Sequence, residues 1–161
     1  MWPGPECPEG VAIAEKMWRG QAERLVPMVQ EVLARADLGF AELDLIVCTI
    51  GPGAFTGVRL GLSAARSFGL ALDIPVLGIT SLQALALSYA LVYDGDLDIA
   101  VLVETRRSDF YAQIFSVQAE PYGTPQALDL EAVDALLDKH VGKFILIGDA
   151  AARYLDESRK V

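Results

Sequence analysis

The chain has 161 residues, of which 53% are apolar, and a formal net charge of −9. A chain of this length and apolar content can bury a core, as one medium domain or two small lobes. The net negative charge argues against an extended basic face for nucleic acid, although not against a local basic pocket. With only Cys7 and Cys48 present, a disulfide scaffold or a four-cysteine zinc site is not expected.

The N-terminal stretch MWPGPECPEG contains three prolines and no periodicity, so we predict a disordered lead-in over 1–10. It lacks the basic and apolar regions of a signal peptide. No apolar run in the chain is long enough to span a bilayer. We therefore expect a cytoplasmic protein without a membrane partner.

The hydrophobic pattern predicts helices and strands in alternation. A short strand is expected over 11–15, and the helix that follows carries one apolar stripe. The next run, LDLIVCTI, is typical of a fully buried strand. The expected helices are 21–36, 57–72, 81–93 (with Thr80 or Ser81 as N-cap), 129–141 and 149–158, and the expected strands are 43–50, 74–80, 99–105, 109–117 and 143–148.

This order indicates an α/β fold with two lobes. Strands and helices alternate in the first half as they do in parallel βα units, whereas the second half opens with an antiparallel hairpin. A turn-rich joint, DGDLD, separates the halves. We predict a first lobe over 11–95 and a second lobe over 96–161, whose sheet would have only three strands and look incomplete.

A tight turn, Gly51-Pro52-Gly53, joins a predicted strand to a predicted helix. It is not a Walker A loop, because no lysine follows Gly57, and the glycine spacing does not fit a dinucleotide-binding fingerprint. Thr56 is placed to cap the following helix. The sequence favours a well-formed strand-to-helix turn, while free N–H groups at the helix start could still bind an anion.

The helix after this turn has one face with almost no side chains. Gly57, Gly61, Ala65 and Gly69 recur at intervals of four, and a helix-interior glycine costs about 1 kcal/mol relative to alanine. The face therefore predicts the close approach of another backbone. That backbone belongs either to the same chain, as a sheet or helix, or to another subunit.

Charged residues gather at the predicted hairpin: Glu104, Arg106, Arg107 and Asp109. They could form a pocket, but exposed charges at a turn are usually solvated, and we favour that interpretation. The single histidine, His140, ends a helix. With one histidine the chain has no metal-binding histidine pair, and any Ser/His/Asp set would have to use His140. We expect no catalytic and no metal-binding residues.

Several segments together resemble a known family. GPGAFTGVRLGLSAARSFGLAL followed by IPVLGITSLQALA is similar to the signature of TsaB-type proteins, the Gcp-like family formerly called M22 glycoproteases. RGQAERLVPMVQEVL, LVETRRSDFYAQIF and ILIGDAAARY resemble further segments of that family, so the similarity runs from about Arg19 to Tyr154. The motif loop comprises Gly51, Pro52, Gly53, Phe55, Thr56, Gly57 and Arg59.

The resemblance implies the two-lobed fold of actin, Hsp70 and sugar kinases, called ASKHA. It also implies a role in forming threonylcarbamoyladenosine next to the tRNA anticodon, as a non-catalytic paralogue that binds a TsaD-type catalytic subunit and a TsaE-type ATPase. The tRNA would be met only through that complex, as would any weakly bound nucleotide; no cofactor is expected. The expected partner-helix interface consists of Leu25, Met28, Val32, Gly57, Gly61, Ala65 and Gly69.

The chain also departs from the family pattern. The family's first strand, similar to ILAIDTS, is not found, and the sequence stops soon after GDAAARYL. We therefore expect both lobes to be incomplete and any nucleotide site to lack its first hairpin. Two alternatives stay open: a transferase or ATP-binding enzyme of the same fold, and a homodimeric scaffold built on the small-residue face.

Overall fold

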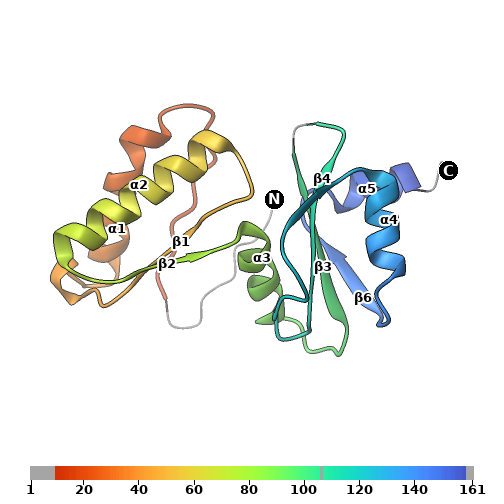
Figure 1. Cartoon of the computed structure of the whole chain (residues 1–161). Coiled ribbons are helices and arrows are strands. Elements are labelled where there is room, and N and C mark those ends of the chain that lie inside the picture. The colour runs from red at the N-terminus through yellow and green to blue at the C-terminus, as the bar shows by residue number, and fades with distance from the viewer. Residues whose placement is uncertain (1–9, 106, 159–161) are drawn as a thin grey trace. The chain divides into compact units, whose positions relative to one another are not determined.

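The structure is a computed structural model that describes residues 10–105 and 107–158. The chain forms two compact units (Figure 1). The first contains the described residues up to Cys48 together with Phe55–Gly78, and the second contains Thr49–Ala54 and the described residues from Ile79 onward. The predicted lead-in, except for residue 10, lies outside the described residues, as does Arg106.

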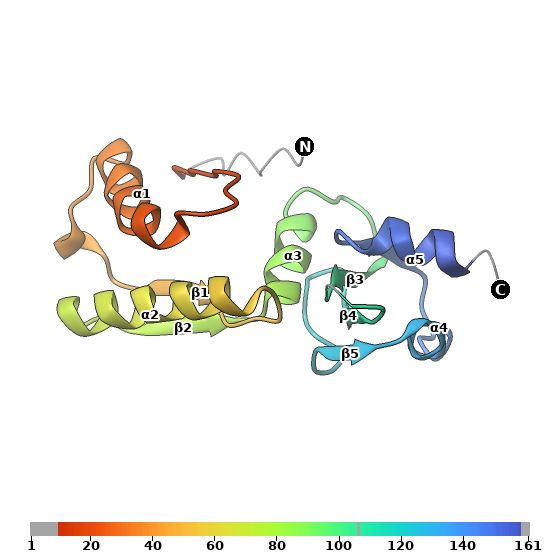
Figure 2. The same cartoon turned by 90° about the horizontal axis from the view of Figure 1, so that it is seen from above.

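The first unit is built from two helices and two short strands. Its elements are α1 (Gln21–Arg35), the 3-10 helix η1 (Phe40–Glu42), β1 (Ile46–Thr49), α2 (Phe55–Leu72) and β2 (Val76–Ile79). The N–H of Ile46 donates to Pro75 O and that of Ile50 to Ile79 O, so the two strands run parallel. Figure 2 shows α2 running alongside this pair of strands. The predicted helices 21–36 and 57–72 are confirmed.

Two strand predictions in this unit were wrong. Residues 11–15 form no strand, and Glu15 instead forms an ion pair with Arg24 of α1. The strand predicted as fully buried is shorter than expected and has alternating burial, with Val47 51% exposed. Leu77 of β2 is likewise 50% exposed. Val47 and Leu77 are exposed because α2 covers only one face of this two-stranded sheet.

The second unit is a four-stranded mixed sheet with three helices. Its elements are α3 (Ser81–Ala90), β3 (Asp98–Glu104), β4 (Phe110–Phe115), β5 (Gln126–Leu128), α4 (Leu130–Asp138), β6 (Phe144–Ile147) and α5 (Ala151–Ser158). The strand order is β5-β4-β3-β6. The hairpin is antiparallel, with Glu104 opposite Phe110, and β6 lies parallel to β3. The prediction of three strands was wrong, because β5 has three residues and too little periodicity to be recognised.

Both faces of this sheet are covered, by α3 on one side and by α4 and α5 on the other (Figures 1 and 2). Leu82 and Ala86 of α3 are fully buried against β3 and β4. Helix α3 begins at Ser81 with Thr80 as its N-cap, whose hydroxyl accepts the N–H of Gln83 at 2.9 Å. The contacts thus group α3 with the second sheet, whereas the predicted lobe boundary at residue 95 groups it with the first lobe.

Candidate functional site

The glycine-proline turn is held by the start of α3. The carbonyl of Gly51 accepts the N–H of Ser81 at 2.8 Å, and Gly51 is buried with φ of 102°, a conformation that glycine adopts without strain. The Gly51–Pro52 peptide bond is cis. Gly53, the last residue of the turn, is exposed. The turn therefore has a structural function within its own unit. This agrees with the predicted well-formed strand-to-helix turn.

The rest of the motif forms the first turns of α2. The helix begins at Phe55, so Thr56 lies inside it, and the prediction that Thr56 is the N-cap was wrong. The Arg59 guanidinium lies 3.8 Å from the centre of the Phe55 ring, one helical turn away. Phe55 is 67% exposed and Arg59 is also exposed. This end of α2 thus presents an aromatic ring and a cation to solvent.

The small-residue face of α2 divides into two halves. Ala65 and Gly69 are buried, and a methyl group on Gly69 would overlap Val76 Cγ2 of β2 and lie 3.2 Å from Ile74 O. Their small size is explained by the sheet of the same chain. Outside α2 itself, a methyl group on Gly61 would meet no atom of residues 10–105 and 107–158 within 4 Å, and Gly57 is exposed. Nothing in the described part of the chain explains why Gly61 is small.

Two of the three α1 residues expected at an interface line an apolar groove in the first unit. Met28 and Val32 border this groove of about 380 Å³ together with Phe68 of α2, while Leu25 is half-buried. The Phe68 ring stacks on Phe40 with ring centres 5.4 Å apart. Helices α1 and α2 also contact each other directly. The expected interface residues of the two helices therefore belong to one compact unit.

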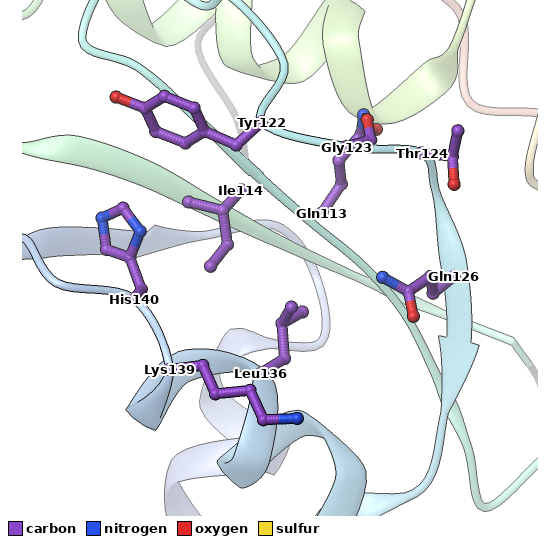
Figure 3. A pocket seen from close by; sticks show the side chains of 9 residues that line it. All are labelled: Gln113, Ile114, Tyr122, Gly123, Thr124, Gln126, Leu136, Lys139 and His140. Carbon is purple, nitrogen blue, oxygen red and sulfur yellow. The ribbon is translucent and has the colours of Figure 1, made fainter.

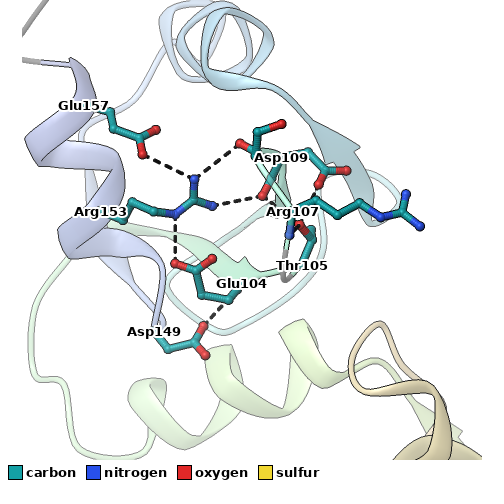
Figure 4. Close-up of polar contacts among 8 residues, drawn as sticks. Glu104, Thr105, Arg107, Asp109, Asp149, Arg153 and Glu157 are labelled. Atoms are coloured by element: carbon teal, nitrogen blue, oxygen red, sulfur yellow. Dashed lines mark hydrogen bonds and ion pairs between the residues drawn. The ribbon is translucent and has the colours of Figure 1, made fainter.

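An arginine of α5 organises the hairpin charges (Figure 4). The Arg153 Nε donates to Glu104 Oε1 at 2.9 Å, and its Nη2 donates to the Asp109 carbonyl at 3.0 Å. Its guanidinium also lies 3.8 Å above the Phe110 ring. Arg153 is not among the predicted site residues, although its spacing of four residues from Glu157, with which it forms an i,i+4 ion pair, is visible in the sequence. Glu104 is thus held by contacts inside the chain.

The tip of the hairpin is ordered by a hydroxyl. Thr105 Oγ1 donates to Asp109 Oδ1 at 2.5 Å, and this bond holds the pKa of the Asp109 carboxyl below its usual value. Figure 4 shows the Arg107 side chain extending away from this cluster, and Arg107 is exposed. Of the four residues predicted for a hairpin pocket, Glu104 and Asp109 lie together, Arg107 faces solvent and Arg106 is outside the described residues.

His140 lies next to an acidic residue from a different element. Its Nε2 is 2.9 Å from Asp98 Oδ2, although not in good hydrogen-bond geometry, and the Tyr122 hydroxyl donates to Asp98 Oδ1 at 3.3 Å. Burial and the Asp98 charge raise the pKa of Tyr122. Among residues 10–105 and 107–158, no group of three or more His, Cys, Asp or Glu side chains could hold a metal ion. No helix in the same part of the chain is long and apolar enough to cross a membrane.

Curated relatives match more than half of the chain. An uncharacterized protein of Mycobacterium bovis is 42% identical over 95 residues, which are 58% of this chain and 41% of the relative. The tRNA threonylcarbamoyladenosine biosynthesis protein TsaB of Haemophilus influenzae is 31% identical over 64% of this chain and 43% of the relative. The chain thus spans about two fifths of the length of these relatives.

Solved structures have the same fold. YeaZ from Pseudomonas aeruginosa superimposes with a TM-score of 0.65 at 32% identity, over 71% of this chain and 55% of that chain. A second structure, of an uncharacterized protein with similarity to peptidase YeaZ from P. aeruginosa, gives a TM-score of 0.70 at 24% identity, over 91% and 78%. The fold is therefore the Gcp-like, ASKHA type. The model of the TsaD family, tRNA N6-adenosine threonylcarbamoyltransferase, matches residues 10–139, so the chain belongs to this family, as a TsaB-type member.

Proposed function

We propose that this chain is a non-catalytic subunit in the formation of threonylcarbamoyladenosine next to the tRNA anticodon. It binds a TsaD-type catalytic paralogue and, through the resulting complex, a TsaE-type ATPase and tRNA. It works in the cytoplasm and binds no nucleotide tightly by itself, which calorimetry with ATP on the purified chain checks. Relatives named as tRNA threonylcarbamoyladenosine biosynthesis proteins TsaB support a role in this tRNA modification.

The observation that carries the subunit role is the open position at Gly61. A glycine inside a helix costs about 1 kcal/mol relative to alanine, and a methyl group here would meet no atom of another described element within 4 Å. A partner helix that approaches the backbone closely gives this glycine a reason. Gly57 lies one turn earlier on the same helix and is also exposed. The partner surface that we propose therefore centres on the first half of α2.

The bonding at the hairpin supports a non-catalytic role. A catalytic carboxylate needs to reach a substrate, whereas Glu104 accepts a hydrogen bond from Arg153 and Asp109 accepts one from Thr105. The backbone N–H of Glu104 in turn donates to Asp149 Oδ1 at 3.0 Å. These groups stabilise the junction of the hairpin with α5, and we propose no catalytic role for them.

A matched pair of substitutions in α2 tests the subunit contact. Gly61→Leu places a bulky side chain on the small-residue face, whereas Ser63→Leu places the same side chain at an exposed position about 200° further round the helix. We expect Gly61→Leu to weaken binding to a TsaD-type protein at least about tenfold and to lower threonylcarbamoylation of tRNA in the reconstituted system. Ser63→Leu should change neither.

Binding is measured by calorimetry and by co-purification of the two chains. Circular dichroism of each variant verifies that α2 still forms. If Gly61→Leu binds the TsaD-type chain as tightly as the unmodified protein does, the first half of α2 is not the contact. If the chain forms only dimers with itself in light scattering and ignores the TsaD-type protein, the homodimeric scaffold is the better explanation.

A further inference from the structure

One exposed face of α2 carries two arginines. Arg59 and Arg66 are the charged residues of this helix, and they lie seven residues apart, which is about 10 Å along the axis. Both are exposed, as is Ser63 between them on the same face. Within residues 10–105 and 107–158 neither arginine forms an ion pair, and Arg59 lies over the Phe55 ring instead. Arg59, Ser63 and Arg66 are termed the arginine stripe.

Helix α4 of the second unit presents the same spacing with the opposite charge. Glu131 and Asp138 are also seven residues apart, and both are exposed, as is Ala135 between them. Neither carboxylate forms an ion pair in the part of the chain that the structure describes. The third acid of the helix, Asp134, is engaged elsewhere, since it accepts the Tyr154 hydroxyl at 2.6 Å. Glu131, Ala135 and Asp138 are termed the acidic stripe.

The acidic stripe lies on the outer side of its helix. The inner side of α4 packs on the sheet, and Leu136 points toward Ile114 of β4 across a hollow of about 200 Å³ (Figure 3). Lys139, which follows Asp138 in the sequence, lines the same hollow. The stripe itself therefore contains no basic residue that would neutralise its two carboxylates.

The two stripes are complementary in spacing as well as in charge. The charged side chains of each stripe are separated by the same seven residues, about 10 Å in a helix, so two ion pairs can form at the same time. The residues between the charges, Ser63 and Ala135, are small. Small residues at the centre of a contact allow two helices to approach each other closely.

The antiparallel order of the two helices is favoured by their dipoles, because it brings the positive N-terminal end of α2 to the negative C-terminal end of α4. In this order the ion pairs are Arg59 with Asp138 and Arg66 with Glu131. Phe55, which is 67% exposed, then lies near Val141, whose side chain is fully exposed beyond the end of α4. The contact would thus cover apolar surface in addition to pairing the charges.

We propose that the arginine stripe of one copy of this chain binds the acidic stripe of a second copy. Because the two surfaces differ, the contact is heterologous, and the assembly either grows beyond a dimer or closes into a ring. Surface ion pairs are weak and are screened by salt, so the self-association is weak and salt-dependent. Gly61 lies on roughly the opposite side of α2, so this contact is distinct from the proposed surface for a TsaD-type chain.

Sedimentation equilibrium of the full chain measures the self-association. The weight-average mass should rise with protein concentration at low salt, about 20 mM, and the association constant should fall at least about fivefold at about 500 mM salt. A mass that stays monomeric up to about 1 mM protein, where even weak specific contacts are populated, would overturn the proposal. An association that salt does not weaken would also contradict it.

Two variants of equal net charge test which residues pair. Arg59→Glu combined with Asp138→Arg exchanges the charges of one proposed ion pair, so the association should stay within about threefold of that of the unmodified chain. Arg59→Glu combined with Glu131→Arg places like charges opposite each other at both positions, and the association should weaken at least about tenfold. Equal association of the two variants would contradict the antiparallel pairing.

Two further variants separate the contact from a general effect of charge. Arg59→Glu with Arg66→Glu makes the chain, of net charge −9, more negative, whereas Glu131→Arg with Asp138→Arg makes it less negative. A general charge effect would shift their self-association in opposite directions, but we expect both to lose it. An equimolar mixture of the two should associate again, because each supplies the surface that matches the other; a mixture that stays monomeric would overturn the contact.

Circular dichroism of each variant verifies that the helices still form. Gly61→Leu, which tests the proposed contact with a TsaD-type chain, should leave the self-association unchanged. A loss of self-association in Gly61→Leu would place the contact on the small-residue face of α2 and contradict the arginine stripe.

Discussion

Two glycines of α2, eight residues apart, should respond in opposite ways to the same substitution. Alanine at either position gains about 1 kcal/mol of helix propensity. At Gly61 the added methyl meets no other element of the described structure within 4 Å, so Gly61→Ala should raise the free energy of unfolding by up to about that amount. At Gly69 the methyl would overlap Val76 Cγ2 and press on Ile74 O from 3.2 Å.

The cost at Gly69 arises because neither neighbour can move freely. The Val76 side chain cannot rotate freely, because valine is stiff about χ1. The Ile74 carbonyl cannot move away easily either, because the N–H of the same residue donates to Gly69 O at 3.1 Å. Overpacking of this kind costs about 1–3 kcal/mol. After the propensity gain of about 1 kcal/mol, Gly69→Ala should be less stable than the unmodified protein by up to about 2 kcal/mol. The propensity contribution is common to both variants, so they should differ by about 1–3 kcal/mol.

Urea denaturation followed by circular dichroism at 222 nm measures both free energies, and hydrogen exchange of α2 amides assigns the change to the first unit. Equal stabilities of Gly61→Ala and Gly69→Ala would refute the reasoning, because the contact with β2 would then cost nothing. A loss of stability in Gly61→Ala would show that a group of the chain does approach Gly61. That result would also remove the main argument for the partner surface.

Two further predictions concern the hairpin. Arg153→Met should lower the free energy of unfolding by about 1–3 kcal/mol, because Asp109 O and Glu104 lose their donor, whereas Arg107→Met should change it little; similar losses in thermal unfolding of both variants would contradict the clamp. The Thr105 hydroxyl lowers the pKa of Asp109 in the folded state, so its contribution to stability is present above about pH 4 and is lost as the pH falls through the folded pKa. Thr105→Val should bring the pKa of Asp109 in the folded state closer to its value in the unfolded state. The free energy of unfolding should then fall less steeply as the pH is lowered through and below about pH 4, which urea denaturation at a series of pH values measures.

Much of the local structure was readable from single segments. The helices around 21–36 and 57–72 follow from apolar periodicity, and the antiparallel hairpin follows from two β-rich runs around a short charged turn. The motif with Gly51 and Gly53 carried the family resemblance. By contrast, β5 with three residues has no periodicity to read, and Thr56 looked like an N-cap because the helix start could not be located within two residues.

The candidate surfaces divide in the same way. A face of small residues on α2 and a group of charges at the hairpin can both be read from the sequence, since both are properties of spacing within one element. Long-range packing is needed to show that Gly69 is small because β2 returns against it, while Gly61 stays open among the described residues. The same holds for Arg153, which reaches Glu104 across 49 positions of the chain, and for the Oε1 acceptor of Gln113, which is buried without a partner among the described residues. Such pairings depend on how distant segments pack together, and no local pattern of residues encodes the distance between them.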